Sequence, residues 1–310
     1  MRPSRIVVIG AGHMGTLHAR KLSQVPGAKV VAVADIAHAR AEKLASELGC
    51  RAHDDFRALL GDADAAVVAV PADQHYAVLR SCLEAKLHAL VEKPIATSVE
   101  DASALIALAA RQQRVLQVAH VQRFNGAFRA IAARIDRPLF IDAERLAGFQ
   151  LRGAEVDVVL DLMIHDIDLA LALARSPVTE VRACGFSVLT PGIDIANAHI
   201  EFESGCVADL SASRVSQAPV RKLRVFQTDL YVSADLQAGR LRYVKQSGGA
   251  IEEMEENHAG GDALAVQAEQ FVFSILKKEP AGVDGESGAR ALQLAIEVGR
   301  LVRERLQRFG

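Results

Sequence analysis

The chain has 310 residues, with 36 Lys and Arg against 38 Asp and Glu, which gives a formal net charge of −2. Half of the residues are hydrophobic and 24% are charged, a composition typical of a folded globular protein and too apolar for a disordered one. The length indicates two domains, and the balanced charge gives no reason to expect nucleic acid as a partner. No stretch approaches the roughly 18 apolar residues that a membrane span needs, so we expect a cytoplasmic protein with no membrane partner.

The first third of the chain alternates short β-branched runs with longer stretches rich in Ala and Leu. We expect strands at residues 5–9, 29–34, 65–70, 89–92 and 115–118, and helices at residues 15–24, 38–48, 74–85 and 99–111. Apolar strands that alternate with helices predict a parallel sheet covered on both faces. Residues 1–119 are therefore predicted to form a doubly wound α/β domain.

The pattern changes after His120. Helices are expected at residues 128–134, 160–174, 262–278 and 287–308, and most of residues 139–245 alternates as strands. Turn signals at Ser204-Gly205 and Ala238-Gly239 predict hairpins, so residues 120–310 are predicted to form an α+β domain with a mainly antiparallel sheet. The acidic residues 252–256, which lie between two glycine pairs, are expected to form a mobile loop.

Three glycines directly follow the first predicted strand and open the first helix. In the G-x-G-x-x-G pattern, Gly10 permits a tight turn, Gly12 lets the backbone approach a pyrophosphate, and Gly15 packs the helix on the strand. Asp35 ends the second strand, where its carboxylate would bind an adenosine ribose and repel a 2′-phosphate. This favours NAD over NADP, although the nearby Arg40 would soften the preference. The alternative is a glycine-rich surface turn with an unrelated aspartate.

Lys93 stands in the sequence Glu92-Lys93-Pro94 at the end of a predicted parallel strand. Ligands bind at the carboxyl ends of such strands, where a lysine can stabilise an oxygen that gains negative charge. A lysine before a proline is otherwise more often a surface charge. The sequence leaves open whether the bond to Pro94 is cis.

A second group of ionisable residues lies in the predicted helix at residues 160–174. Asp161, His165 and Asp168 would fall on one face of this otherwise apolar helix. A histidine suits removal of a proton from an alcohol, and a neighbouring aspartate could orient it. Two other readings are an N-cap aspartate with a core histidine, and a metal site built on Asp-x-x-x-His. No third ligand is apparent and the four cysteines form no CxxC pair, so we expect no metal.

These motifs, in this order and near this spacing, resemble those of the Gfo/Idh/MocA family, the glucose–fructose oxidoreductase and inositol dehydrogenase family of NAD(P)-dependent enzymes. The resemblance covers essentially the whole chain. It implies an N-terminal Rossmann domain and a C-terminal domain whose open sheet often joins subunits, so we expect a homo-oligomer, a dimer or a tetramer. It assigns catalysis to Lys93, Asp161 and His165. Met163 departs from the glycine of many members and should alter pocket shape more than chemistry.

The resemblance also implies the binding residues. Cofactor contacts are expected from Gly10, Gly12, His13, Met14, Gly15, Asp35, Ile36, Pro71, His75, Glu92, Lys93 and Gln122. Substrate contacts are expected from Lys93 and His165, and from Arg123 and Asn125, which lie where the first domain passes into the second and could reach a diphosphate or sugar hydroxyls. By their charge alone, further candidates for contact with an anion are Arg145, Arg152, Arg214 and Arg221.

The substrate comes from a finer resemblance. Residues 120–125 and 156–168 are similar to the branch that oxidises the 3-hydroxyl of UDP-N-acetylglucosamine to a ketone. That ketone feeds an aminotransferase on the route to 3-amino sugars, including those of some lipid A. One alternative is an NAD-dependent dehydrogenase of a free polyol such as an inositol. Another is a non-catalytic NAD-binding regulator, which would have no use for the three catalytic residues.

Overall fold

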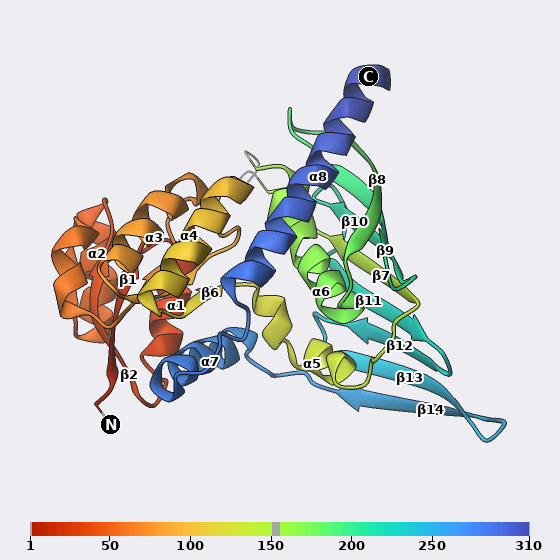
Figure 1. The fold of residues 1–310 in the computed structure, drawn as a ribbon, viewed down its shortest axis with the longest axis horizontal. Coiled ribbons are helices and arrows are strands. Elements are labelled where there is room, and N and C mark those ends of the chain that lie inside the picture. The colour runs from red at the N-terminus through yellow and green to blue at the C-terminus, as the bar shows by residue number, and fades with distance from the viewer. Residues whose placement is uncertain (1, 151–155, 310) are drawn as a thin grey trace. The chain divides into compact units, whose positions relative to one another are not determined.

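The computed structural model describes residues 2–150 and 156–309, and the chain packs into two compact units (Figure 1). The first unit combines Met1–Val121 with Asp262–Leu292. The second combines Gln122–Gly261 with Gln293–Gly310. The chain therefore leaves the first unit, builds most of the second, returns to the first and ends in the second.

A six-stranded sheet forms the centre of the first unit, and every neighbouring pair of its strands is parallel. Its order is β3-β2-β1-β4-β5-β6. The strands are β1 (Ser4–Ile9), β2 (Ala28–Ala34), β3 (Arg51–His53), β4 (Ala65–Val68), β5 (His88–Val91) and β6 (Leu116–Val118). The direction of winding reverses between β1 and β4, and open α/β sheets bind ligands at such a point. The doubly wound prediction is confirmed.

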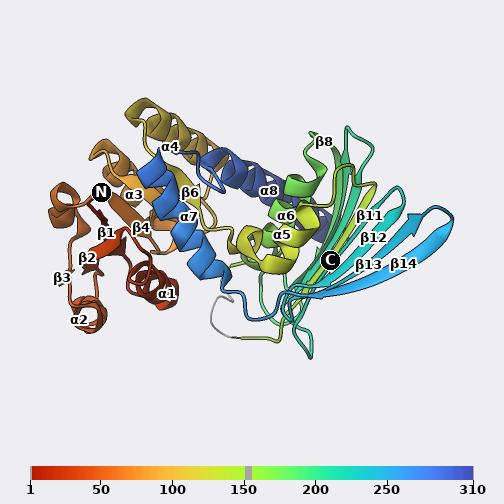
Figure 2. The same cartoon turned by 90° about the horizontal axis from the view of Figure 1, so that it is seen from below.

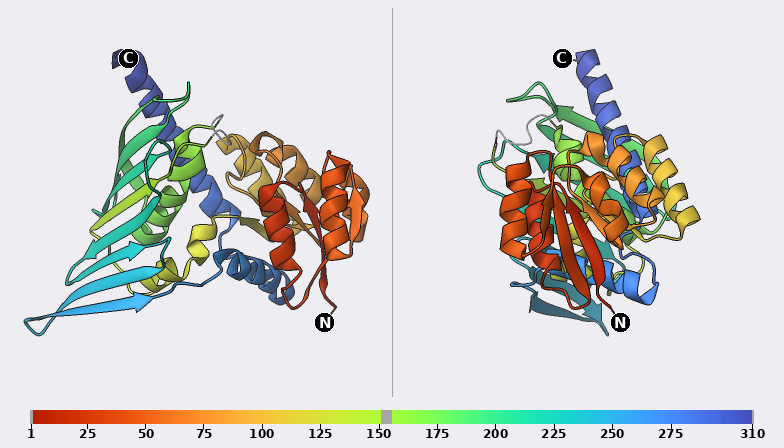
Figure 3. Two further views of the ribbon diagram at one scale, coloured as in Figure 1. Left: turned by 180° about the vertical axis from the view of Figure 1, so that it is seen from behind. Right: turned by 90° about the vertical axis from the view of Figure 1, so that its left-hand side faces the viewer.

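Helices cover both faces of this sheet (Figure 3). On one face α1, α2 and α7 contribute Leu22, Leu44 and Phe271 to a shared apolar core. On the other, α3 packs on β4 and β5 and against α4. The helices are α1 (His13–Leu22), α2 (His38–Leu48), α3 (His75–Glu84), α4 (Val99–Gln112) and α7 (Ala263–Lys277), with the 3-10 turns η1 (Phe56–Asp62) and η2 (Ala72–Gln74).

Helix α7 follows the strands of the second unit in sequence but packs in the first. Ala268, Phe271 and Val272 are buried in its core, and Asp262 at the start of α7 pairs with Lys21 of α1 at 2.7 Å. Sequence analysis assigned everything after residue 119 to the second domain, and the structure differs for Asp262–Leu292. The apolar face of α7 predicts burial, but not which sheet buries it.

An eight-stranded sheet forms the second unit, in the order β14-β13-β12-β11-β7-β10-β9-β8. Only β7 and β10 are parallel neighbours, so the sheet is mainly antiparallel, as predicted. The strands are β7 (Phe140–Leu146), β8 (Val178–Phe186), β9 (Ile195–Phe202), β10 (Val207–Ser213), β11 (Val220–Gln227), β12 (Leu230–Asp235), β13 (Arg240–Ser247) and β14 (Ala250–Asn257). Gly205 and Gly239 take the left-handed conformation in two of the predicted turns, with φ of +83° and +69°.

Helices of the second unit lie on one face of this sheet (Figure 2). Helix α6 packs on β7 and β10, and α5 packs on β12. Along β7, Ile141, Ala143 and Arg145 are buried, whereas Asp142 and Glu144 on the opposite face are half-buried. The elements are η3 (Val121–Phe124), α5 (Gly126–Ala132), the π-helical turn η4 (Val159–Met163) and α6 (Ile164–Ala174), and α8 (Gly285–Phe309) begins in the first unit and ends in the second.

The acidic stretch at residues 252–256 forms most of β14, so the expectation of a mobile loop is wrong. Gly248 and Gly249, with φ of +58° and +86°, turn the chain between β13 and β14. Arg242 pairs with Glu253 at 2.7 Å, and Lys245 lies opposite Glu252. Basic side chains on the neighbouring strand β13 therefore balance the negative charge of this acidic run. The acidic segment read by itself does not reveal these partners.

All four cysteines are free thiols. Burial raises the pKa of Cys82 to about 12 and that of Cys206 to about 11, so both are protonated near neutral pH. Within residues 2–150 and 156–309, no helix combines the length and the apolar character that a membrane crossing requires.

Candidate active site

The glycine loop joins the carboxyl end of β1 to α1. Gly10 has a φ of +96°, and a Cβ there would lie 2.4 Å from the carbonyl oxygen of Ala69. A Cβ at Gly15 would lie 1.7 Å from the carbonyl oxygen of Gly10. Both distances are far below van der Waals contact, so the loop and the helix can pack this closely only with glycine at both positions.

Gly12 has a different environment. No atom lies within 4 Å of the place where its Cβ would be. It is the N-cap residue of α1, and among the described residues no side chain caps the first turn. The helix therefore presents its first backbone N–H groups, at the positive end of its dipole, to an anion. The pyrophosphate of a dinucleotide fits this cradle, which a side chain at residue 12 would fill.

Asp35 connects the end of β2 to the glycine loop. Its two carboxylate oxygens accept hydrogen bonds from the N–H groups of Ala11, at 2.7 Å, and Ala37, at 2.8 Å. A carboxylate has further lone pairs, so Asp35 can order the loop and still accept from ribose hydroxyls. The next residue, Ile36, is 97% exposed and offers an apolar surface on which an adenine ring can pack.

Two buried histidines hold the turn that carries Lys93, which is joined to Pro94 by a cis peptide bond. His18 on α1 lies with its Nε2 atom 2.7 Å from one oxygen of Glu92, and the other oxygen of Glu92 accepts the Lys93 N–H at 3.2 Å. His75 at the start of α3 lies with Nδ1 2.7 Å from the Pro94 carbonyl oxygen. The turn is thereby fixed from two helices.

The charges of these groups follow from their surroundings. Burial raises the pKa of Glu92, but the hydrogen bond and charge of His18, together with Lys93, leave it below its ordinary value. Burial lowers the pKa of His75, against the effect of the carbonyl groups of Pro94 and Val70. Glu92 is therefore a carboxylate near pH 7.

The His75 ring, expected to contact the cofactor, lies inside the protein. It is 1% exposed, and its Nδ1 and Nε2 atoms lie 2.7 Å and 3.0 Å from the carbonyl oxygens of Pro94 and Val70. Both ring nitrogens face the protein backbone, so the structure gives no support to a polar contact between His75 and the cofactor. His75 is the first residue of α3, and its Nδ1 contact ties that helix to the turn at Pro94.

The other expected cofactor residues are divided between the two units. His13 is exposed and Met14 half-buried in the first turn of α1, and Pro71 is exposed after β4. Gln122 belongs to the second unit. Its Oε1 atom is buried and accepts no hydrogen bond from a described residue, which makes it a possible acceptor for a ligand.

Asp161 and His165 lie where a π-helical turn continues into an α-helix. Asp161 is in η4 and His165 is in the first turn of α6, and both are half-buried. Sequence analysis placed them one regular α-helical turn apart. A π-turn closes i→i+5 hydrogen bonds, so Asp161 is rotated relative to that expectation.

The loop after β8 supports the start of this π-turn. Val158 donates its N–H to the carbonyl oxygen of Ile193 at 2.9 Å. The buried carboxylate of Asp194 accepts three backbone N–H groups, from residues 188–190, and the Thr190 hydroxyl. Burial raises the pKa of Asp194, but these hydrogen bonds lower it to about 2. An ionised Asp194 therefore holds the loop together at all but strongly acidic pH.

Two arginines pair with aspartates of α6. Arg123 donates from Nε and Nη2 to Asp168 at 2.8 Å and 3.0 Å, and Arg145 donates from the same two atoms to Asp166 at 2.8 Å and 2.6 Å. Asp168 is 1% exposed and Asp166 is 3% exposed. Arg123 therefore commits two of its donors to the protein, and Arg145 serves as an anchor of α6 rather than as an anion site.

Asn125 caps α5. Its side-chain oxygen accepts the N–H groups of Ala127, at 3.0 Å, and Phe128, at 3.3 Å, and its amide donates to the Leu236 carbonyl oxygen at 3.0 Å. These bonds occupy both ends of the amide group. The expected contact with substrate is therefore not favoured, because the local sequence places Asn125 at the start of a helix.

The remaining arginine candidates differ in exposure. Arg214 is 6% exposed and donates to the Val156 carbonyl oxygen. Arg221 is exposed on β11, and Arg152 lies outside the described residues. Among the described residues, no group of three or more His, Cys, Asp and Glu side chains is arranged to hold a metal ion.

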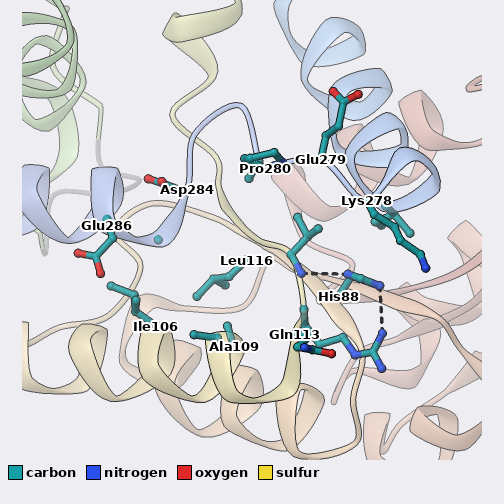
Figure 4. A pocket seen from close by; sticks show the side chains of 16 residues that line it. His88, Ile106, Ala109, Gln113, Leu116, Lys278, Glu279, Pro280, Asp284 and Glu286 are labelled. Carbon is teal, nitrogen blue, oxygen red and sulfur yellow. Dashed lines mark hydrogen bonds between the residues drawn. The ribbon is translucent and has the colours of Figure 1, made fainter.

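A cavity of about 700 Å³ lies at the amino ends of β5 and β6 in the parallel sheet (Figure 4). It is lined by His88 and Leu116, which begin β5 and β6, and by residues of α4 and those after α7. Burial, with the charge of Arg114, lowers the pKa of His88 to about 4. The glycine loop and Lys93 follow the carboxyl ends of their strands, so this cavity is separate from the cofactor edge.

Comparison with known families assigns both units. Residues 4–120 match the model described as "Oxidoreductase family, NAD-binding Rossmann fold", and residues 125–232 match the GFO/IDH/MocA C-terminal domain. The chain belongs to the Gfo/Idh/MocA oxidoreductase family. The first unit is therefore an NAD-binding Rossmann domain, and the resemblance drawn from the motifs is confirmed together with NAD as the cofactor.

Individual relatives extend the match. UDP-N-acetylglucosamine 3-dehydrogenase from Acidithiobacillus ferrooxidans is 36% identical over 98% of this chain and 99% of its own, and a solved structure of it superposes with a TM-score of 0.93. The scyllo-inositol 2-dehydrogenase (NAD(+)) of Bacillus subtilis is 31% identical over 68% of each chain. The structure of scyllo-inositol dehydrogenase from Lactobacillus casei with NAD(H) and scyllo-inositol shares the fold, with a TM-score of 0.85 at 20% identity over 98% of each chain.

Proposed function

We propose that this protein oxidises the 3-hydroxyl of UDP-N-acetylglucosamine to a 3-keto sugar with NAD. The observation that carries this proposal is the match to UDP-N-acetylglucosamine 3-dehydrogenase, at 36% identity over 98% of the chain. The 3-keto product would be consumed by an aminotransferase on a route to 3-amino sugars such as those of lipid A.

We assign the chemistry to three residues. When bound, NAD supplies the acceptor for the hydride that leaves the sugar carbon. His165 accepts the proton of the 3-hydroxyl, and Asp161 orients the imidazole and stabilises its charged form. Lys93 donates a hydrogen bond to the same hydroxyl oxygen, which lowers the cost of the negative charge that develops there. The Glu92 and Pro94 bonds to buried histidines support Lys93 in that position.

We assign cofactor binding to the carboxyl edge of the parallel sheet. The first turn of α1, with Gly12, His13 and Met14, would take the pyrophosphate, and Ile36 would pack on the adenine. Asp35 would bind the adenosine ribose, and its carboxylate would repel the 2′-phosphate of NADP. Pro71 and Gln122 would complete the cofactor site. Arg123 would contact the substrate with the guanidinium N–H groups that do not donate to Asp168.

The decisive experiment follows NADH absorbance during incubation with UDP-N-acetylglucosamine. An aminotransferase with its amino donor is added to one arm to remove the ketone and draw the reaction forward. NADH formation in that arm supports the proposal, and no NADH in either arm contradicts it. Scyllo-inositol serves as the comparison substrate, since turnover of it alone would favour the polyol alternative, to which the inositol dehydrogenase relatives point.

Two substitutions test the assigned chemistry. Lys93→Met and His165→Ala should lower kcat by about 10²-fold or more, because each removes a group that acts in the transition state. NAD affinity should change little. The matched controls are Lys29→Met and His38→Ala, which change exposed residues of β2 and α2. Full turnover in either catalytic variant would remove that residue from its role, and NAD binding without turnover of any substrate would favour the non-catalytic regulator.

We propose a homo-oligomer, a dimer or tetramer in the cytoplasm, joined through the open face of the eight-stranded sheet. Helices α5 and α6 lie on the other face. On the open face, Phe226 packs against Phe140 and Tyr231 with ring centroids 5.8 Å and 4.7 Å away, and it stays 38% exposed. A second copy of the sheet would cover these rings. Light scattering after size exclusion tests this, and the mass of a single chain would refute it.

A further inference from the structure

Two arginines of the second unit lie opposite each other on neighbouring strands. Arg145 on β7 is the register partner of Arg221 on antiparallel β11. Partners in such a pair point to the same face of a sheet, and the next residues along this face, Ala143 and Leu223, are each 1% exposed. Arg145 and Arg221 therefore both belong to the face that α6 covers.

These two positive charges share one carboxylate. Asp166 accepts two hydrogen bonds from Arg145, whereas the guanidinium of Arg221 makes no hydrogen bond or ion pair with any described residue; only the backbone of Arg221 is bonded, with its carbonyl oxygen accepting from the Leu236 N–H at 2.8 Å. Although Arg221 is exposed, partial loss of water around its guanidinium and the charge of Arg145 lower its pKa, against the effect of Asp166. Like charges directly opposite on a sheet are destabilising, so this arrangement leaves one uncompensated positive charge on the face.

The carboxylate with which Arg221 interacts belongs to the residue after His165. Asp166 follows His165 in the first turn of α6, and its bonds to Arg145 fasten that turn to the sheet. In a nucleotide sugar the diphosphate is attached at C1, two ring bonds from C3. Binding of a nucleotide sugar therefore requires a group near His165 that binds the diphosphate. A neutral inositol carries no charge for such a group to bind.

We propose that Arg221 binds the diphosphate of the substrate and makes the site specific for a nucleotide sugar over a neutral polyol. The proposal rests on the proposed function. Arg145 is held by Asp166, so the guanidinium of Arg221 keeps its donors for a ligand, and a guanidinium matches the geometry of phosphate oxygens.

The test compares Arg221→Gln with Lys222→Gln. Lys222 is the next residue on β11, is exposed and points to the opposite face, so its substitution removes the same charge away from the site. We expect Arg221→Gln to raise KM for UDP-N-acetylglucosamine about tenfold or more and to leave KM for NAD nearly unchanged. Arg221→Lys should recover part of the loss. Lys222→Gln should behave as the unaltered protein.

A stability measurement separates binding from folding. Because Arg221 faces a like charge, Arg221→Gln should unfold at the same or a higher temperature than the unaltered protein. A clear loss of thermal stability would mean that Arg221 is held by contacts within the protein, and it would overturn the proposal.

Calorimetric titration with UDP distinguishes failure of this inference from failure of the proposed function. If UDP-N-acetylglucosamine is not oxidised but UDP binds and Arg221→Gln weakens its binding about tenfold, the proposed reaction fails and the diphosphate site stands. If the substrate is oxidised and Arg221→Gln matches Lys222→Gln in both KM and UDP affinity, the diphosphate site is overturned and the reaction stands.

Discussion

Replacing Gly12 or Gly15 by alanine should have opposite consequences for folding and for cofactor binding. The Cβ of Gly15→Ala would be placed 1.7 Å from the Gly10 carbonyl oxygen, whereas the Cβ of Gly12→Ala would meet no atom within 4 Å. The first substitution must move backbone. The second fits the protein and fills the space where a pyrophosphate would approach the α1 N-terminus.

The expected magnitudes follow from these distances. Gly15→Ala should lower the free energy of unfolding by about 3 kcal/mol, the upper end of the range for overpacking, because a carbonyl group cannot swing away as a side chain can. For Gly12→Ala, alanine is a poorer N-cap than glycine but reduces the entropy of the unfolded chain, so stability should stay within about 1 kcal/mol. Displacing the pyrophosphate should cost one charge-assisted hydrogen bond or more, about 1.5–3 kcal/mol each, and raise Kd for NAD roughly 10- to 100-fold.

The assay combines urea unfolding with titration of NADH fluorescence. Gly61→Ala is the control, since residue 61 is exposed in η1 and its Cβ would also meet nothing within 4 Å. It should change neither quantity appreciably. Unaltered NADH affinity in Gly12→Ala would refute the assignment of this cradle to the pyrophosphate, and unaltered stability in Gly15→Ala would refute the packing argument.

Three further predictions concern buried charges. His18→Leu and Glu92→Gln should each destabilise the protein, and urea unfolding of the double variant should reveal a coupling of about 1–3 kcal/mol, whereas simple additivity would contradict the bond between them. Arg145→Met should cost about 1.5–3 kcal/mol, because it removes the two hydrogen bonds to buried Asp166 while the positive charge of Arg221 stays near that carboxylate, and adding Asp166→Leu should recover much of the loss; no recovery would show that the arginine acts through packing alone. The folded pKa of Asp194 is about 2, below its unfolded value, so it stabilises the fold above pH ~4 and loses about 2 kcal/mol as pH falls toward 2. Asp194→Asn should flatten this part of the stability profile measured against pH, and an unchanged slope would assign acid sensitivity to other groups.

Local sequence pattern was sufficient to predict those parts of the fold that depend on interactions between residues close together in the chain. The alternation of apolar strands and helices identifies a parallel sheet, and the glycine spacing identifies a loop in which a Cβ at residue 10 or 15 would meet backbone. The turn at Gly205 is likewise a local matter, because only glycine adopts a φ of +83° without strain. These predictions depend on residues close together in the chain.

Sequence pattern was insufficient where the partners of a residue come from distant segments. The acidic run in β14 looks like a solvated loop until Arg242 and Lys245 of the neighbouring strand are placed beside it. Asn125 looks like a substrate ligand until the Leu236 carbonyl oxygen, far along the chain, is found at its amide group. His75 looks like a cofactor ligand until Pro94 and Val70 are found at its two nitrogens.

The sequence by itself determined the class of the fold through its periodicity, the dinucleotide cofactor through the glycine spacing and Asp35, and the family through the resemblance of its motifs. Only the tertiary structure decided which charged side chains pair with one another inside the protein. Arg123 and Arg145 are paired with Asp168 and Asp166, and Arg221 is not. Pairing depends on distances between side chains far apart in sequence, and periodicity reports only the face on which each side chain lies.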